Sequence, residues 1–187
     1  MAKTNISWAD MVWNPIVGCS KVSAGCANCY AVKEVRRLAG HPHPKIAKDF
    51  AGLVEKHSNG QLDWTGEVRL LSDRLRQPFT WKKPRRIFVN SMSDVFHEEV
   101  QQEWLDQIFA VMALTPQHSY QVLTKRPERM KEYCSDNQTP FRIARAIDAI
   151  RVNQEIQKRP YEMRAIPGLD KYYIDTTGAV WTLHGSG

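Results

Sequence analysis

The chain has 187 residues, of which 42% are hydrophobic and 25% charged, a composition that excludes disordered, collagen-like and disulfide-framework proteins. The net charge of +6 is compatible with an anionic partner such as nucleic acid but does not establish one. No signal-like N-terminal segment and no apolar run of about 18 residues is present, so we expect a cytoplasmic protein without a membrane span.

Strand and helix patterns alternate through most of the chain. A first strand is expected within residues 11–17, and the helix that follows a cysteine-rich loop ends at Gly40. Residues 41–61 have the pattern of an irregular connection with one helical segment, and residues 66–71 that of a short strand. The continuous apolar residues 87–89 predict a strand buried on both faces, which indicates a parallel sheet.

The alternation continues beyond this strand. The clearest helix pattern covers residues 98–114 and ends at Thr115–Pro116, and residues 119–124 predict a further strand. Pro127 suits the first position of another helix. Repeated strand–helix order predicts an α/β fold, and because a complete (βα) barrel needs roughly 250 residues, we expect a partial, TIM-barrel-like fold of about four βα units.

The pattern changes after Tyr133, and this change predicts the domain organisation. We expect a three-cysteine, partial-barrel domain over residues 1–135, followed by a basic linker helix over residues 136–160. Residues 161–187 are rich in β-formers and turn signals and predict a small β-rich part. The last two segments together make a short α+β C-terminal appendage.

Three of the four cysteines, Cys19, Cys26 and Cys29, lie in one loop directly before a predicted helix. Four thiolates saturate a 4Fe–4S cluster, whereas three leave one iron open for a substrate or cofactor. A structural zinc ion would need a fourth ligand, which would have to come from Cys134, His41 or His43. The spacing therefore indicates a metal site on these three cysteines, with an iron–sulfur cluster or zinc as its two interpretations, and the alternative is that the thiols only pack.

Three segments carry a resemblance to a known family. They are SWADMVWNPIVGCSKVSAGCANCYA, WKKPRRIFVNSMSDVFHEEV and FAVMALTPQHSYQVLTKRPERM. Over about residues 3–133 the chain resembles a family of phage and prophage proteins with a three-cysteine motif, which is considered similar to radical S-adenosylmethionine enzymes and has no assigned reaction. The resemblance implies a barrel-type fold, a 4Fe–4S cluster on Cys19, Cys26 and Cys29, and S-adenosylmethionine at the open iron.

The sequence departs from this family after Tyr133, because the later strands of the family have no counterpart here. In α/β barrels several strand ends share ligand binding. We therefore expect a truncated protein that is inactive alone and has a partner protein completing the barrel.

Polar residues that follow the cysteines or the predicted strands are the candidate cofactor-binding residues, because ligands bind at the carboxyl ends of strands in such folds. The alternative for these positions is turn capping or a solvated loop. The candidates are Tyr30, Asn90, Ser91, Ser93, Asp94, Thr124 and Lys125.

The C-terminal part carries a weaker resemblance. Residues 161–184, which include IPGLDKYYIDTTGAVWTL, resemble the DNA-binding segment that accompanies HNH homing endonucleases. Basic residues gather just before it, where the alternative is an amphipathic helix that packs on an open sheet edge. The candidate nucleic-acid-binding residues are Arg142, Arg145, Arg151, Lys158 and Arg159.

These observations together lead to one expected function and one alternative. The resemblance implies an iron–sulfur, S-adenosylmethionine-dependent radical protein of phage origin. The alternative is a non-catalytic phage protein that is stabilised by zinc or binds DNA.

Overall fold

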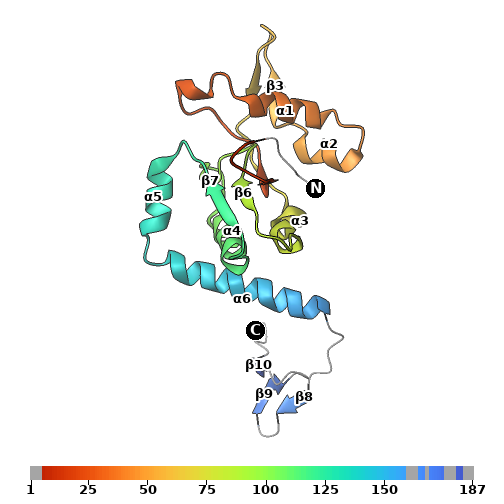
Figure 1. Ribbon diagram of the computed structural model, residues 1–187, viewed down its shortest axis with the longest axis vertical. Helices are drawn as coiled ribbons and strands as arrows, with labels where there is room; N and C mark the ends of the chain where they lie inside the picture. Colours follow the sequence, from red (N-terminus) through yellow and green to blue (C-terminus); the bar gives the residue numbers. More distant parts are fainter. Residues whose placement is uncertain (1–5, 159–163, 167–168, 175–179, 183–187) are drawn as a thin grey trace. The chain divides into compact units, whose positions relative to one another are not determined.

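The computed structural model describes residues 6–158, 164–166, 169–174 and 180–182, with side chains described up to Val152. The chain forms two compact units, Met1–Ile147 and Asp148–Gly187. Helix α6, Thr139–Lys158, runs through the boundary between them (Figure 1). No helix of the described residues is both long and apolar enough to cross a membrane.

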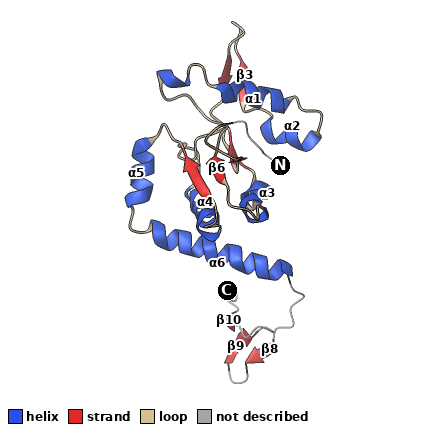
Figure 2. Ribbon diagram, in the orientation of Figure 1, coloured by secondary structure: helices blue, strands red, loops and turns tan. Residues whose placement is uncertain are grey.

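The first unit alternates short strands with helices (Figure 2). Its strands are β1 Met11–Trp13, β2 Ile16–Val17, β3 Val54–Lys56, β4 Leu62–Trp64, β5 Arg69–Leu70, β6 Arg86–Val89 and β7 Ser119–Val122. Its helices before α6 are η1 Ala24–Cys26, α1 Tyr30–Ala39, α2 Pro44–Phe50, α3 Ser72–Leu75, η2 Gln77–Thr80, α4 Gln102–Leu114 and α5 Pro127–Ser135.

The central sheet is parallel and has the order β1-β6-β7. Trp13 pairs with Val89, which in turn pairs with Val122, so the three strands end at the same edge of the sheet. The middle strand is apolar along most of its length, and Ile87 and Val89 are fully buried. The predicted α/β class and its parallel sheet are therefore confirmed, and Pro127 begins α5 as expected.

Two smaller pairings differ from the expected strand–helix order. Strand β5 lies within the predicted residues 66–71 but pairs antiparallel with β2 rather than joining the parallel sheet. The segment 41–61, expected to be irregular after one helix, also contains β3, which forms an antiparallel hairpin with β4. Gly60 supplies the left-handed backbone of its turn, with φ +85°. Strands of two or three residues are too short to leave a clear periodic signal.

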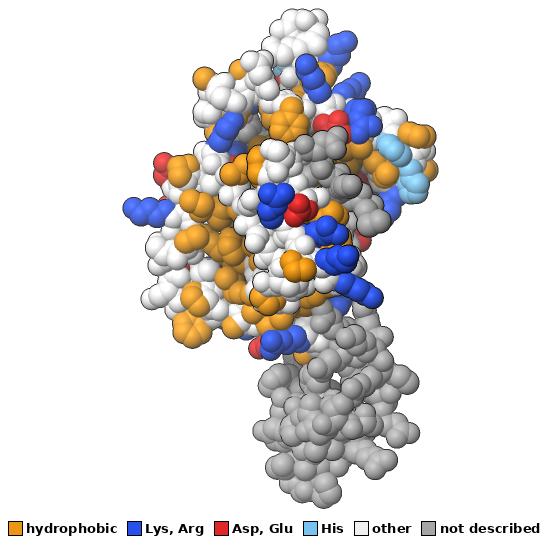
Figure 3. Space-filling model, in the orientation of Figure 1, with side chains coloured by type: hydrophobic (Ala, Val, Ile, Leu, Met, Phe, Trp, Pro, Cys, Tyr) orange, Lys and Arg blue, Asp and Glu red, His pale blue; other side chains and the backbone are white. Residues whose placement is uncertain are grey.

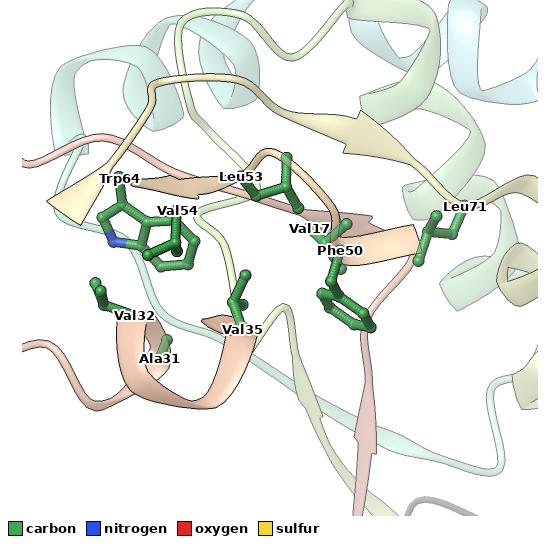
Figure 4. Packing of buried hydrophobic residues seen from close by; sticks show 9 residues of the cluster. All are labelled: Val17, Ala31, Val32, Val35, Phe50, Leu53, Val54, Trp64 and Leu71. Carbon is green, nitrogen blue, oxygen red and sulfur yellow. The ribbon is translucent and has the colours of Figure 1, made fainter. Parts of the chain in front are cut away.

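A buried apolar cluster joins the cysteine-proximal helix to this hairpin. Figure 4 shows side chains of α1, α2, β2 and β4 facing one another, with Leu53 and Val54 among them. The cluster consists of Val17, Ala31, Val32, Val35, Phe50, Leu53, Val54, Trp64 and Leu71, and Cys19 and Cys29 pack against it. The cysteine loop is therefore in direct contact with this apolar cluster through Cys19 and Cys29.

Replacement of Leu53 by alanine tests this packing. Leu53 is completely buried, and its loss leaves a cavity, so we expect the free energy of unfolding to fall by about 2–5 kcal/mol in urea denaturation. The matched control Leu123→Ala, at a side chain that is 58% exposed, should change it by less than about 0.5 kcal/mol. Equal losses in the two variants would contradict the assigned core.

The second unit contains an antiparallel sheet in the order β10-β9-β8. Its strands are β8 Arg164–Ile166, β9 Leu169–Ile174 and β10 Val180–Thr182. The remaining residues of the segment that resembles a DNA-binding element lie outside the described residues.

Candidate functional site

The carboxyl ends of the parallel strands meet the cysteine loop and form a cavity of about 280 Å³. Asn90 follows β6, Leu123 follows β7, and the cysteine loop begins after β2. The cavity is lined by Cys19, Ser20, Cys26, Cys29, Tyr30, Trp64, Phe88, Asn90, Ser91, Ser93, Asp94, Leu123, Thr124, Lys125 and Arg126. The wall of this one cavity, which we call the cysteine pocket, therefore contains all three cysteines of the loop and every candidate cofactor-binding residue predicted from the sequence.

Gly18 fixes where the cysteine loop begins. Its φ of +92° lies in the left-handed region, and a Cβ atom at this position would lie 2.1 Å from the carbonyl oxygen of Glu67. The N–H of Gly18 donates to the carbonyl oxygen of Met92 at 3.2 Å, and a parallel bridge joins Gly18 to Ser93. Only glycine satisfies both the conformation and the close approach, and Cys19 follows directly.

Alanine at Gly18 is expected to disturb the site more than alanine at Gly66. Both residues have left-handed backbones, which cost an alanine about 1–2 kcal/mol, but nothing lies within 4 Å of a Cβ at Gly66. The clash with Glu67 should add about 1–3 kcal/mol for Gly18→Ala. Urea denaturation measures the difference, and equal losses would contradict the described contact.

Two basic residues after β7 contact two of the cysteines. Nζ of Lys125 lies 3.5 Å from Sγ of Cys26, and Nη1 of Arg126 lies 3.9 Å from Sγ of Cys19. Burial disfavours the thiolate of Cys26, but hydrogen bonds from the backbone and from Ser23, with Lys125, lower its pKa to about 7. Burial raises the pKa of the Cys19 thiol, and the positive charge of Arg126 opposes this effect. Two thiols of the loop thus have cationic partners.

The strand-end residues form the polar part of the wall. The hydroxyl of Tyr30 donates to the carbonyl oxygen of Ser91 at 2.8 Å, and the hydroxyl of Ser93 donates to that of Ile16 at 2.8 Å. Asn90 has a left-handed backbone, with φ +57°, which asparagine tolerates. Its Nδ2 is buried and has no partner among the described residues. An unpaired buried amide donor is costly, and Asn90 is therefore suited to an acceptor on a bound group.

Asp94 is a buried carboxylate that joins the loops after β6 and β7. Its oxygens accept hydrogen bonds from the hydroxyl of Thr124 at 2.8 and 3.0 Å and from the backbone N–H of Lys125 at 2.9 Å. They also accept from the backbone N–H of Phe96 at 2.9 Å and from Nη1 of Arg126 at 3.2 Å. These partners compensate for the loss of hydration on burial.

His97 contacts the cysteine loop through a hydrogen bond with Ser20. Its Nδ1 accepts from the backbone N–H of Glu99 at 3.1 Å, so the neutral ring carries its proton on Nε2, 2.8 Å from the hydroxyl of Ser20. Burial, followed by the positive charge of Arg126, lowers the pKa of His97 below its ordinary value of 6.5. The ring is neutral at pH 7.

The lowered pKa predicts a loss of stability in mild acid. As the pH falls, the unfolded chain takes up this proton first, so stability is complete above pH 6.5 and is lost toward the lower folded pKa. We expect His97→Gln to reduce the dependence of the urea midpoint on pH between about pH 7 and 5. The exposed residue His43 provides the matched control, His43→Gln, for which we expect the wild-type slope. A wild-type slope in the His97 variant would contradict this role.

A second, larger cavity of about 560 Å³ adjoins the cysteine pocket and shares Cys29 and Tyr30 with it. It lies between the start of α1 and the β3–β4 hairpin. Its polar residues include Lys21 and Lys33, and Lys21 forms an ion pair with Asp63 at 2.7 Å.

The proposed fourth zinc ligands do not line the cysteine pocket. Cys134 is exposed on α5, and His41 and His43 precede α2. Among the described residues, no three His, Cys, Asp or Glu side chains are arranged around a single metal position. All three cysteines of the loop line the cavity of about 280 Å³.

Sequence reasoning did not place every residue of the pocket. Ser20, Trp64, Phe88 and Leu123 also line it, whereas Arg126, which follows β7 beside Lys125, was expected at the strand ends as a possible anion-binding cation. The Asn59–Gly60 pair was the available signal for the hairpin that brings Trp64 to the wall.

The residues that line the cysteine pocket include none of the candidate nucleic-acid residues whose side chains are described. Arg142 forms ion pairs with Asp136 at 2.8 Å and Asp106 at 3.3 Å, whereas Arg145 and Arg151 are exposed. The side chain of Lys158 and all of Arg159 lie outside the described residues.

The fold and the site together define an α/β protein with a cysteine-lined pocket at the carboxyl ends of its parallel strands. The model of the family described as "Protein of unknown function (DUF5131)" matches residues 3–174. The chain therefore belongs to this family. No curated protein and no solved structure has a significant match to it.

Proposed function

We propose that the protein is an iron–sulfur protein in which Cys19, Cys26 and Cys29 hold a 4Fe–4S cluster and S-adenosylmethionine binds at the open iron. The observation that carries this proposal is the position of all three thiols on one cavity at the carboxyl ends of the parallel strands. Ligands bind at this end of the strands in α/β folds.

The donor set of the pocket fits such a cluster. In a cubane cluster each cysteine binds a different iron, so thiols placed around a cavity suit it better than a single ion. Ligand thiols must be deprotonated, which the pKa of about 7 at Cys26 favours. Lys125 and Arg126 compensate the negative charge that the thiolates bring into the pocket.

The chemistry that a bound cluster supplies is one-electron reduction of S-adenosylmethionine, which yields a radical able to abstract hydrogen from a substrate. The residues of this chain would bind the ligand and shield it from water. Trp64 and Phe88 are buried apolar wall residues that exclude water. Tyr30 and Leu123 are exposed at the pocket, where an organic ligand would cover them. Asn90 offers its unpaired amide donor.

The partial barrel and its partner belong to the same proposal. Among the described residues, β1 and β7 each pair on one side only within the parallel sheet. An open edge is a site for strand pairing with another chain. We therefore propose that a partner protein completes the barrel and the S-adenosylmethionine site.

DNA binding is the less supported alternative. The guanidinium of Arg142 is engaged by two carboxylates. Figure 3 shows several lysine and arginine side chains side by side on the right of the drawn face and others spread over it. Because lysine and arginine side chains commonly face water, this distribution does not by itself indicate nucleic-acid binding.

Reconstitution tests the cluster directly. Anaerobic treatment of the full chain with iron and sulfide is expected to give about four irons per chain and broad absorbance near roughly 400 nm. Cys26→Ala should abolish the cluster because it removes one of three ligands. Cys134→Ala, the matched substitution of an exposed thiol outside the pocket, should leave it unchanged. Iron and sulfide analysis, together with electron paramagnetic resonance of the reduced chain, measures the cluster content of the wild type and of both variants.

Two outcomes would contradict this assignment. One tightly bound zinc ion without uptake of iron would favour the zinc alternative, and equal loss of metal in the two cysteine variants would indicate a four-thiolate site. Formation of 5′-deoxyadenosine at an enzyme-like rate by the isolated, reduced chain would show that no partner is needed.

A further inference from the structure

The guanidinium of Arg126 is buried beside the cysteine pocket, and each of its N–H donors faces an acceptor. Nε donates to the carboxylate of Glu98 at 2.9 Å, and Nη1 donates to Oδ2 of Asp94 at 3.2 Å. Nη1 also faces Sγ of Cys19 at 3.9 Å. Nη2 donates to the hydroxyl of Ser20 at 2.9 Å and to its carbonyl oxygen at 3.4 Å. The planar fork of an arginine makes this set, which the point charge of a lysine cannot reproduce.

These contacts join three segments of the chain. Cys19 and Ser20 begin the cysteine loop, Asp94 and Glu98 follow β6, and Arg126 follows β7. The contact with Cys19 links residues 107 positions apart. Because two carboxylates balance one buried cation, breaking the set would leave a buried charge without its partner.

The neighbouring Lys125 contacts a later part of the same loop. Its Nζ donates to the carbonyl oxygen of Gly25 at 2.8 Å and faces Cys26. Lys125 is exposed, whereas Arg126 is buried and fully hydrogen-bonded. Arg126 is therefore the more strictly oriented of the two basic residues.

We propose that Arg126 is a positioning residue that fixes Cys19 and the start of the cysteine loop for cluster binding, and that it couples this loop to those after β6 and β7. The inference rests on the proposed function for the cluster, but the positioning is a property of the chain alone. Arg126 acts through Cys19, and its contact with the sulfur strengthens when the thiol is ionised by a bound metal.

Hydrogen–deuterium exchange of the metal-free, full-length chain tests the positioning. The variants are Arg126→Met and Arg126→Lys, with Arg37→Met as the matched control, since Arg37 is an exposed helical residue paired with Glu34. Both Arg126 variants should exchange about tenfold or more faster in residues 18–26 and 123–127, with α4 unchanged. The control should exchange like the wild type.

The midpoint potential of the reconstituted cluster separates charge from position. Arg126→Met removes a positive charge beside Cys19, so its potential should shift to a more negative value. Arg126→Lys keeps the charge but not the fork, and we expect a potential near that of the wild type together with faster exchange.

Wild-type exchange in both Arg126 variants would overturn the proposal, and so would faster exchange throughout the chain, including α4. If Arg126→Met does not fold, Ser20→Ala removes one acceptor of the fork and should give a milder increase in the same two segments. Unchanged exchange in that variant would also overturn the proposal. Failure of the wild type to take up iron would refute the proposed function, and the exchange comparison would then decide the positioning alone.

Discussion

The site depends on the hydrogen bonds and the ion pair that the buried carboxylate of Asp94 forms with the loops after β6 and β7. A charged group away from water requires hydrogen bonds or an opposite charge, and Asp94 obtains both from residues that follow β6 and β7. The loops at the two strand ends are consequently fixed relative to each other. Arg126, held by Asp94, then reaches the cysteine loop, so a single desolvated charge organises all three walls of the pocket.

Apolar packing and polar contacts have separate tasks in this region. The buried cluster around Val35 and Leu53 supports the cysteine loop from the side of α1 and the hairpin. Directional hydrogen bonds from Lys125 and Arg126 hold it from the side of the sheet. Apolar packing alone tolerates small shifts, whereas hydrogen bonds specify direction. The combination can hold thiols around an open space without filling it.

The sequence predicted the features that depend on local patterns. The apolar run 87–89 indicated the parallel sheet, and the cysteine loop was placed correctly before a helix. The residues after the strands were placed at one edge, since parallel strands share a direction. The sequence did not reveal which cation of the Lys125–Arg126 pair turns inward, because the buried acceptors come from distant segments. The antiparallel pairing of β5 and the hairpin of β3 and β4 were missed, because pairing with a distant or very short segment leaves no periodic signal in the sequence.

The parallel pairing of β1 with β6 also has a consequence for how the chain folds. Asn14 and Ser91, which join the ends of these strands, are 77 positions apart. Such non-local pairing requires a long loop to close, at a cost in chain entropy, before any stabilising contact forms. This cost slows folding. During synthesis β1 and the cysteines leave the ribosome first and remain unpaired until β6 and β7 are made. The thiols are therefore accessible to solvent and oxidants until the rest of the sheet is made, and any group they bind can be enclosed only afterwards.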